Sequence, residues 1–414
     1  MKLRSYALVT LGYWVFTLTD GALRMLVLLH FNELGYSAVS IAFLFLAYEF
    51  MGIVTNLLGG WVGSIRGLNR TLVAGLGLQI VALVALTLEQ RSWARWLSVA
   101  FVMSMQALSG VAKDLTKMSS KSAVKTVAGE GSLFRLVALL TGSKNALKGV
   151  GFFLGAGLLS WVGYRQALVW MAGALAVTAA LLLVLLKEDI GKSKRKRKLT
   201  SLLSASPSLN RLSAARLFLF GARDIWFVVA LPVFLSDELG WSHEQVGGFL
   251  ALWVIGYGIV QSFTPRLLGE TGKGVRPKFD AVRATLRWSA ILTVVSLCIA
   301  VAAATNTVKT FAVVGGLLVF GAVFAVNSSL HSYLVLVYAA EESVATDVGF
   351  YYSANAAGRF VGTLLSGVLF LWGGLPAALW GSLVFVVFAT GLSVRLSSMP
   401  DGSAVSIAGL EGGD

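Results

Sequence analysis

The sequence predicts an all-α integral membrane protein with twelve transmembrane helices in two six-helix halves. Hydrophobic residues make up 57% of the 414 residues and charged residues 13%, whereas a soluble domain carries about 25% charged residues. Apolar stretches of about 20 residues, the length of a membrane-spanning helix, recur along the chain. In addition, the second half of the chain repeats short sequences of the first half.

The apolar stretches define twelve expected spans. They are residues 7–30, 38–59, 71–88, 95–112, 139–161, 167–187, 213–234, 245–265, 285–304, 310–333, 349–372 and 374–396.

Lys and Arg are distributed unequally between the two sides of these spans. Cytoplasmic loops are rich in Lys and Arg, so we expect both termini in the cytoplasm of a bacterium and the chain in its inner membrane. The side opposite the cytoplasm holds only Arg91, Arg95, Arg165 and Lys309. The cytoplasmic side holds Lys2, Arg4, Arg66, Arg70, Lys113, Lys117, Lys121, Lys125, the run 192–198, Lys273, Arg276, Lys278 and Arg283.

The longest interruption follows the sixth span and contains the basic run 192–198. We therefore expect an N-terminal half at 1–187, a basic cytoplasmic linker at 188–212, a C-terminal half at 213–397 and a disordered cytoplasmic tail at 398–414. The linker is expected to contact anionic lipid, and a regulatory role is the alternative.

Two short sequences recur in the halves. Glu33-Leu-Gly-Tyr-Ser37 follows the first span and Glu238-Leu-Gly-Trp-Ser242 follows the seventh, while Gly52-Ile-Val54 corresponds to Gly258-Ile-Val260. Twelve spans in two parallel repeats around a linker resemble the major facilitator superfamily. The loop from Gly60 to Arg70 resembles the cytoplasmic signature of that family, with Ser64 in the acidic position. This resemblance implies a substrate site near the membrane midplane, between the halves.

Several chemistries are not indicated. Cys298 is the only cysteine, the three histidines are scattered, and no nucleotide, haem or zinc motif is found. The net charge of +14 lies largely in loops between spans, so we expect no nucleic-acid partner. We expect no cofactor, no metal and no enzymatic activity, because no nucleophile–base pair is visible.

Eight charged residues fall within the spans. A charge near the bilayer centre costs a few kcal/mol or more, so such residues are candidates for function. Five of the eight are cations, which favours an anionic substrate. They are Asp20, Arg24, Glu49, Lys144, Lys148, Arg223, Asp224 and Arg359.

The acidic residues are candidates for proton coupling. Asp20 and Arg24 are four residues apart and share a helix face, either as a structural ion pair or as a protonatable carboxylate with an anion ligand. Glu49 has no basic residue within one turn and is expected to be an isolated carboxylate. Arg223 and Asp224 are adjacent, diverge by about 100° and are expected to find different partners.

The remaining cations are candidates for substrate binding. Arg359 is the strongest, because guanidinium binds phosphate bidentately and Tyr352 and Asn355 lie on about the same helix face. If the fifth span begins near residue 139, Lys148 lies about 14 Å inside it. Otherwise Lys144 and Lys148 only reach the interface.

Two further patterns have structural alternatives. Lys113, Lys117, Lys121 and Lys125 repeat every fourth residue and would contact lipid phosphates or attract anions into the protein. The Gly-x-x-x-Gly sequences 151–155 and 358–362 are expected to allow close helix packing.

Four stretches are similar to the organoarsenical efflux permeases of the ArsJ family. They are residues 17–32, 68–79, 107–118 and 139–155. The resemblance implies export of 1-arseno-3-phosphoglycerate, which glyceraldehyde-3-phosphate dehydrogenase makes when arsenate replaces phosphate. It implies a functional link to that enzyme and a role in arsenate resistance.

We therefore expect a monomeric exporter that works by alternating access. Arg223, Arg359, Lys148, Arg24 and Lys144, with Tyr352 and Asn355, would bind phosphate, carboxylate and arsenate groups. Asp20, Glu49 or Asp224 would carry a proton in exchange, although uniport is an alternative. Transport of another organic anion, such as a sugar phosphate or a drug, and a membrane-embedded enzyme are the other interpretations.

Overall fold

The computed structural model describes residues 2–35, 38–90, 92–127, 132–186, 206–269, 280–305, 309–339 and 344–396. Within these ranges all regular secondary structure is helical, as predicted. The elements are α1 (Lys2–Glu33), α2 (Ala38–Arg66), α3 (Leu68–Leu86), α4 (Arg95–Val127), α5 (Leu133–Leu185), α6 (Pro207–Phe227), α7 (Ala230–Val233), the π-helix η2 (Phe234–Glu238), α8 (His243–Leu267), α9 (Ala281–Ala304), α10 (Lys309–Tyr338) and α11 (Val344–Val394).

Two of these helices contain sharp internal breaks. Gly163 in α5 has φ 76° and Gly374 in α11 has φ 63°, values in the region that favours glycine. Each break lies at or close to the boundary between two predicted spans. With α6, α7 and η2 taken as one span, the arrangement is consistent with twelve spans. The predicted tail and most of the linker lie outside the described residues.

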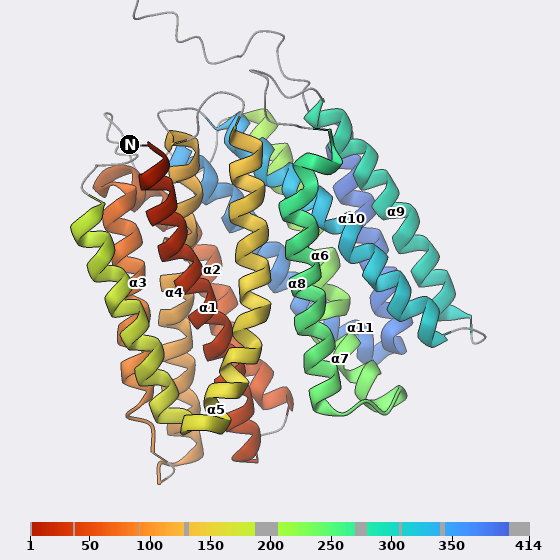
Figure 1. Cartoon of the computed structure of the whole chain (residues 1–414). Coiled ribbons are helices and arrows are strands. Elements are labelled where there is room, and N and C mark those ends of the chain that lie inside the picture. The colour runs from red at the N-terminus through yellow and green to blue at the C-terminus, as the bar shows by residue number, and fades with distance from the viewer. Residues whose placement is uncertain are drawn as a thin grey trace, which may run out of the picture.

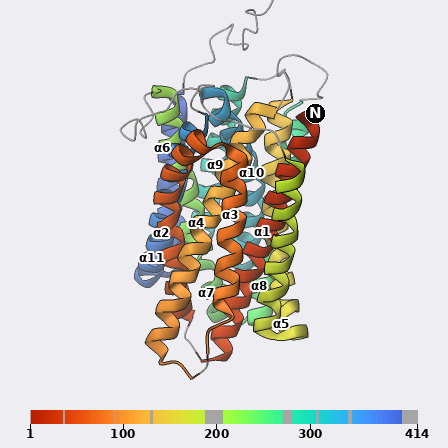
Figure 2. The same cartoon turned by 90° about the vertical axis from the view of Figure 1, so that its left-hand side faces the viewer.

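The helices form two groups (Figure 1). Helices α1–α5 lie in one group and α6–α11 in the other, and Figure 2 shows the first group in front of the second. The groups meet mainly where α5 packs on α8 and α2 packs on α11. A Cβ at Gly258 of α8 would clash with α5 at Ala146, so the two halves approach closely there.

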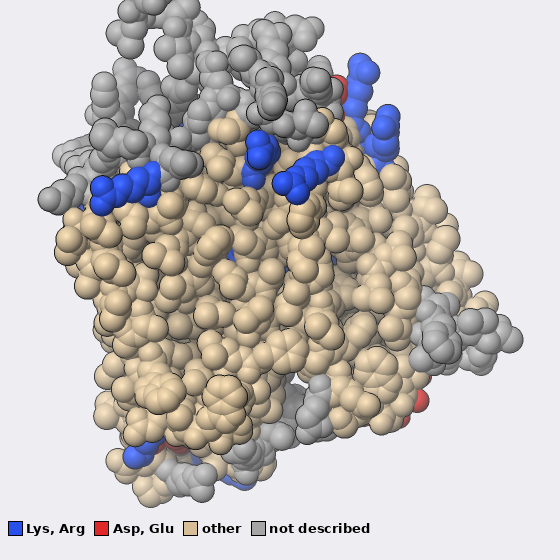
Figure 3. Space-filling view, viewed as in Figure 1, with Lys and Arg blue, Asp and Glu red and all other residues tan. Residues whose placement is uncertain are grey.

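The surface is that of a membrane protein. Eight of the described helices are long and apolar enough to cross a bilayer. Figure 3 shows a wide uncharged band across the described part of one face. Lys and Arg gather above this band, at the end of the bundle where the N terminus lies.

The two Gly-x-x-x-Gly sequences mediate close packing, as predicted. A Cβ at Gly151 or Gly155 would meet the backbone of α1 around Leu18 and Ala22. A Cβ at Gly358 or Gly362 would meet the backbone of α6 at Leu217 and Gly221. Glycine thus brings α5 onto α1 and α11 onto α6, four of the helices that carry charged residues into the bundle interior.

Candidate functional site

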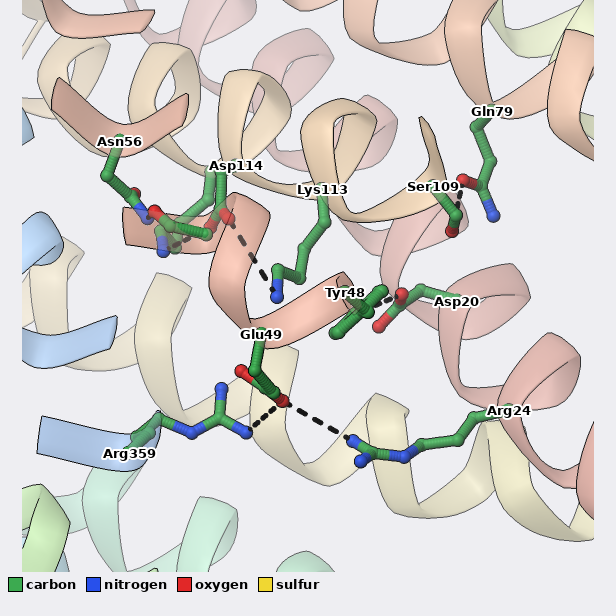
Figure 4. Close-up of polar contacts among 12 residues, drawn as sticks. Asp20, Arg24, Tyr48, Glu49, Asn56, Gln79, Ser109, Lys113, Asp114 and Arg359 are labelled. Carbon is green, nitrogen blue, oxygen red and sulfur yellow. Dashed lines mark hydrogen bonds and ion pairs between the residues drawn. The ribbon is translucent and has the colours of Figure 1, made fainter. Parts of the chain in front are cut away.

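Seven of the predicted charged residues come together near the middle of the bundle. We call them the central ion cluster: Asp20, Arg24, Glu49, Lys148, Arg223, Asp224 and Arg359. They come from both halves, on α1, α2, α5, α6 and α11. Figure 4 shows Arg24 and Arg359 approaching Glu49 from opposite sides.

Asp20 is held by two residues of its own half. Its Oδ2 lies 3.1 Å from Lys148 Nζ, and its Oδ1 accepts a hydrogen bond of 2.6 Å from the Tyr48 hydroxyl. The expected pairing of Asp20 with Arg24 is not the arrangement found, because the Arg24 guanidinium turns toward Glu49, at 3.9 Å. Lys148 on α5 pairs with Asp20 instead of Arg24.

Glu49 is not the isolated carboxylate that was expected. Its Oε1 lies 2.6 Å from Arg359 Nη2, across the interface between the halves, in addition to the contact with Arg24. A pattern within one helix could not show these partners, because they come from α1 and α11. The Glu49–Arg359 ion pair joins the two halves.

Asp224 binds two arginines through its two oxygens. Its Oδ2 accepts a hydrogen bond of 3.1 Å from Arg359 Nε, and its Oδ1 accepts one of 2.6 Å from Arg223 Nε. The expectation that Arg223 and Asp224 find different partners is therefore wrong. Adjacent side chains leave a helix in different directions, but the long Arg223 side chain bends back to its neighbour.

The halves carry equivalent ion pairs. Asp20 of α1 pairs with Lys148 of α5, and Asp224 of α6 pairs with Arg359 of α11. In each pair a glycine, Gly151 or Gly362, follows the cation by three residues and lets the two helices approach.

The spacing between the acidic residue of the ion pair and the repeated Glu-Leu-Gly sequence differs by one residue between the two halves. Asp20 precedes Glu33 by 13 residues, whereas Asp224 precedes Glu238 by 14. The π-helix η2 ends at Glu238 and accommodates the extra residue.

The lysines of α4 point into the protein. Lys117 Nζ lies 2.5 Å from Asp114 Oδ1, and Lys113 Nζ lies 3.8 Å from its Oδ2. Lys121 donates to the Tyr352 hydroxyl and Lys125 to the Ala339 carbonyl, both in the other half. Lys113, Lys117 and Lys121 therefore face the interior rather than lipid phosphates and contribute positive charge to it, while Lys125 is half-buried at the end of α4.

The other predicted ligands lie nearer to the N-terminal end of the bundle than Arg359. Tyr352 accepts the hydrogen bond from Lys121, and Asn355 Oδ1 accepts one of 2.9 Å from Arg216 Nε. Lys144 is half-buried, so it does not simply reach the interface, and its Nζ donates to Asn145 Oδ1 at 3.1 Å.

Arg216 and Asp114 are buried charged residues that were not among the predicted site residues; Glu89, Lys121 and Asp347 are others. Arg216 stands close to the start of the predicted seventh span, but α6 begins at Pro207, which places it about 14 Å along the helix. The signal was Ser206-Pro207, because the Ser206 side chain accepts a hydrogen bond from Leu209 N and Pro fits the first helical turn. Asp114 lies beyond the predicted end of the fourth span, whereas α4 continues to Val127.

The cations of the central ion cluster are more accessible than the acids. The side chains of Arg24 and Arg359 are 28% and 22% exposed, against 6% for Glu49 and 1% for Asp224. Charged groups at this depth face a polar space rather than lipid. The guanidinium groups of Arg24 and Arg359 are thus more exposed than the carboxylates of Glu49 and Asp224.

This difference in access predicts a difference in thiol reactivity. In a Cys298→Ser background, we expect Arg24→Cys to react at least about tenfold faster than Asp224→Cys with a water-soluble thiosulfonate, because reactivity follows exposure. The measurement is the labelling rate in intact membranes, with the cysteine-free chain as the blank. Equal rates would show that no aqueous space reaches Arg24.

A metal site is not indicated within the described ranges, where no group of three or more His, Cys, Asp or Glu residues is suitably placed. The chemistry available is binding of anions by Arg and Lys and of protons by Asp and Glu.

Comparison with solved structures shows the same fold in several transporters. The chain superimposes on a bacterial homologue of the iron transporter ferroportin in the outward-facing state, with a TM-score of 0.79, 15% identity, and 95% and 99% of the two chains covered. For the human organic anion transporter MFSD10 the TM-score is 0.74 and the identity 17%, with 95% of this chain and 99% of that chain covered. For the proton:xylose symporter XylE the TM-score is 0.73 and the identity 14%, with 96% of each chain covered.

A search of curated protein sequences finds no significant match. At the identities found, the solved structures establish the fold alone. The family model of the Major Facilitator Superfamily, however, matches residues 9–282, which is more than half of the chain. This match agrees with the two groups of helices, and the chain belongs to the major facilitator superfamily of membrane transporters.

Proposed function

We propose that this transporter exports a small organic anion, the arsenical 1-arseno-3-phosphoglycerate, by alternating access between its halves. The observation that carries the proposal is the central ion cluster, where Arg24 and Arg359 are accessible and their carboxylate partners are buried. The sequence similarity to organoarsenical efflux permeases supports the choice of an arsenical and a role in arsenate resistance.

The cations have complementary tasks in this proposal. Arg359 and Arg24 are the first to meet the anion, since guanidinium binds phosphate and arsenate oxygens in a bidentate manner. Lys148 and Arg223 lie beside them and add positive charge while they hold Asp20 and Asp224.

The carboxylates provide a route for coupling. When an anion takes Arg359, Glu49 and Asp224 lose a cation and become able to accept a proton for the return step. Asp20 is the third candidate. Export of an anion from a negative interior is itself favoured by about 2.3 kcal/mol per charge per 100 mV, so uniport remains an alternative to proton exchange.

The topology follows from the charge distribution. We place the N-terminal end of the bundle, where Lys and Arg gather, in the cytoplasm of a bacterium, with the apolar band in its inner membrane. Both termini are then cytoplasmic, the halves span 1–187 and 213–397, and the transporter is a monomer surrounded by lipid.

An efflux experiment tests the substrate. Cells that express the chain and are loaded with radiolabelled arsenate are compared with and without glyceraldehyde-3-phosphate dehydrogenase. We expect efflux of labelled organic arsenical only when both proteins are present. Efflux that does not depend on the dehydrogenase would contradict the arsenophosphoglycerate assignment.

The alternative is export of another organic anion, such as a sugar phosphate or a drug. The excess of cations in the central ion cluster favours this class over neutral substrates. Family membership points to a transporter rather than to a membrane-embedded enzyme.

A further inference from the structure

A second group of cations lies nearer to the N-terminal end than the central ion cluster. It consists of Arg216 on α6, Lys121 on α4 and Lys144 on α5, which we call the inner cation layer. Lys144 lies four residues before Lys148 on α5 and Arg216 lies eight residues before Asp224 on α6, or about 6 Å and 12 Å along the helix. The layer is therefore distinct from the central ion cluster but within reach of one small molecule that touches both.

Arg216 is buried among neutral partners. Its Nη1 donates to the carbonyl and hydroxyl oxygens of Ser328, each at 3.2 Å, and its Nε donates to Asn355. The guanidinium carbon lies 3.8 Å from the centre of the Phe220 ring. Arg216 is only 2% exposed, so water does not solvate its charge.

Lys121 is also buried and Lys144 is half-buried, and both have neutral partners. Lys121 is 7% exposed and donates to the Tyr352 hydroxyl, while Lys144 donates to the side chain of Asn145. Asn145 donates to Gln261 at 2.6 Å, and Gln261 donates to Ser328 at 3.1 Å. This chain of polar groups links Lys144 of one half to Arg216 of the other.

The inner cation layer lacks negative charge. No carboxylate among the described residues lies within 4 Å of Arg216, Lys121 or Lys144, whereas Lys148, Arg223, Arg359 and Arg24 each have one. Buried charges without counter-charge are strongly unfavourable in a protein and in a membrane. The layer therefore favours any anion that can reach it.

Unused hydrogen-bonding groups surround the layer. The Tyr351 hydroxyl, the Thr141 hydroxyl and both ring nitrogens of His331 are buried and have no partner among the described residues. Lys121, Thr141 and Tyr352 also line a cavity of about 10 Å³ between α4, α5, α10 and α11. That volume holds one water molecule, so a larger ligand requires the halves to separate at this end.

We propose that the inner cation layer is a second anion subsite, which binds the doubly charged phosphate group of an organophosphate when the N-terminal end of the bundle opens. The subsite rests on the proposed function and assigns the substrate an orientation. The phosphate lies at Arg216, Lys121 and Lys144, and the other anionic end lies at Arg359 and Arg24. We expect a dianion here because none of the three cations is neutralised by a carboxylate.

Binding of 3-phosphoglycerate and inorganic phosphate to the purified chain in lipid nanodiscs tests the subsite. We expect Lys144→Met and Lys121→Met each to weaken binding of both probes at least about tenfold, the loss typical of one buried charge-assisted contact. Arg211→Gln is the control on α6, since Arg211 is exposed and donates to the Arg395 carbonyl. Binding of both probes to this variant should stay within about twofold of wild type, as for surface changes.

The unfolding temperature without ligand provides an independent readout. Replacement of an uncompensated buried cation by an apolar side chain of similar length is often neutral or stabilising, so both Met variants should unfold at or above the wild-type temperature. A merely structural role would instead lower it. Unchanged binding in both folded variants would overturn the subsite alone, while a wild-type chain that binds neither probe would overturn the phosphate-bearing substrate as well.

Discussion

Replacement of Arg359 by glutamine is expected to abolish transport. Arg359 binds Glu49 at 2.6 Å and Asp224 at 3.1 Å and is one of the two accessible guanidinium groups of the central ion cluster. Loss of a charge-assisted contact worth about 3 kcal/mol lowers transport by roughly 100-fold or more. Arg359→Lys should also lose most activity, because ammonium cannot make bidentate contacts. The measurement is initial efflux rate per inserted protein.

The same change has a cost in stability. Removal of one partner from a buried ion pair costs about 3–5 kcal/mol, and here two carboxylates lose their cation. The triple variant Glu49→Gln, Asp224→Asn, Arg359→Gln should therefore regain stability but not transport. Arg283→Gln, at a side chain that is 88% exposed, is the control. Wild-type efflux in Arg359→Gln or Arg359→Lys would remove Arg359 from the site.

A single methyl group at Gly358 is expected to disrupt the C-terminal half. A Cβ there would overlap the carbonyl oxygen of Leu217, so α11 would have to move away from α6. Overpacking of this kind costs about 1–3 kcal/mol or more. It would also separate Arg359 from Asp224. We expect Gly358→Ala to lower both the unfolding temperature of the purified protein and its transport rate.

The matched control lies on the same helix. A Cβ at Gly367 has nothing within 4 Å, and Gly→Ala within a helix is favourable by roughly 0.5–1 kcal/mol. Gly367→Ala should therefore keep or raise the unfolding temperature. If the two variants unfold at the same temperature, α6 and α11 are not in backbone contact at Gly358.

The fold could be predicted from the sequence because it depends on local properties. Lengths of apolar stretches placed the spans, and the breaks at Gly163 and Gly374 occur close to predicted boundaries. Helix ends were less predictable. Helix α4 continues to Val127 and α6 begins at Pro207, beyond the apolar stretches, so Asp114 and Arg216 were not recognised as buried.

The partners of the charges could not be predicted, because they depend on how helices pack. Spacing within one helix suggested Asp20 with Arg24 and an isolated Glu49, but glycine contacts bring α5 onto α1 and supply Lys148 instead. Glu49 finds Arg359 on a helix some 300 residues away in the sequence. The sequence therefore indicated which residues carry charge in the membrane, while packing decides which cations remain without a carboxylate.

The Glu49–Arg359 ion pair also bears on leakage. It links one half to the other through Arg359, the residue that we propose binds the anion. In the proposed mechanism, an anion that binds Arg359 breaks the Glu49–Arg359 ion pair. The ion pair forms again when the anion leaves. In the proposed mechanism, neutral metabolites of similar size cannot replace the Glu49 carboxylate at Arg359. We therefore expect the protein not to transport such neutral metabolites, without a separate gate against them.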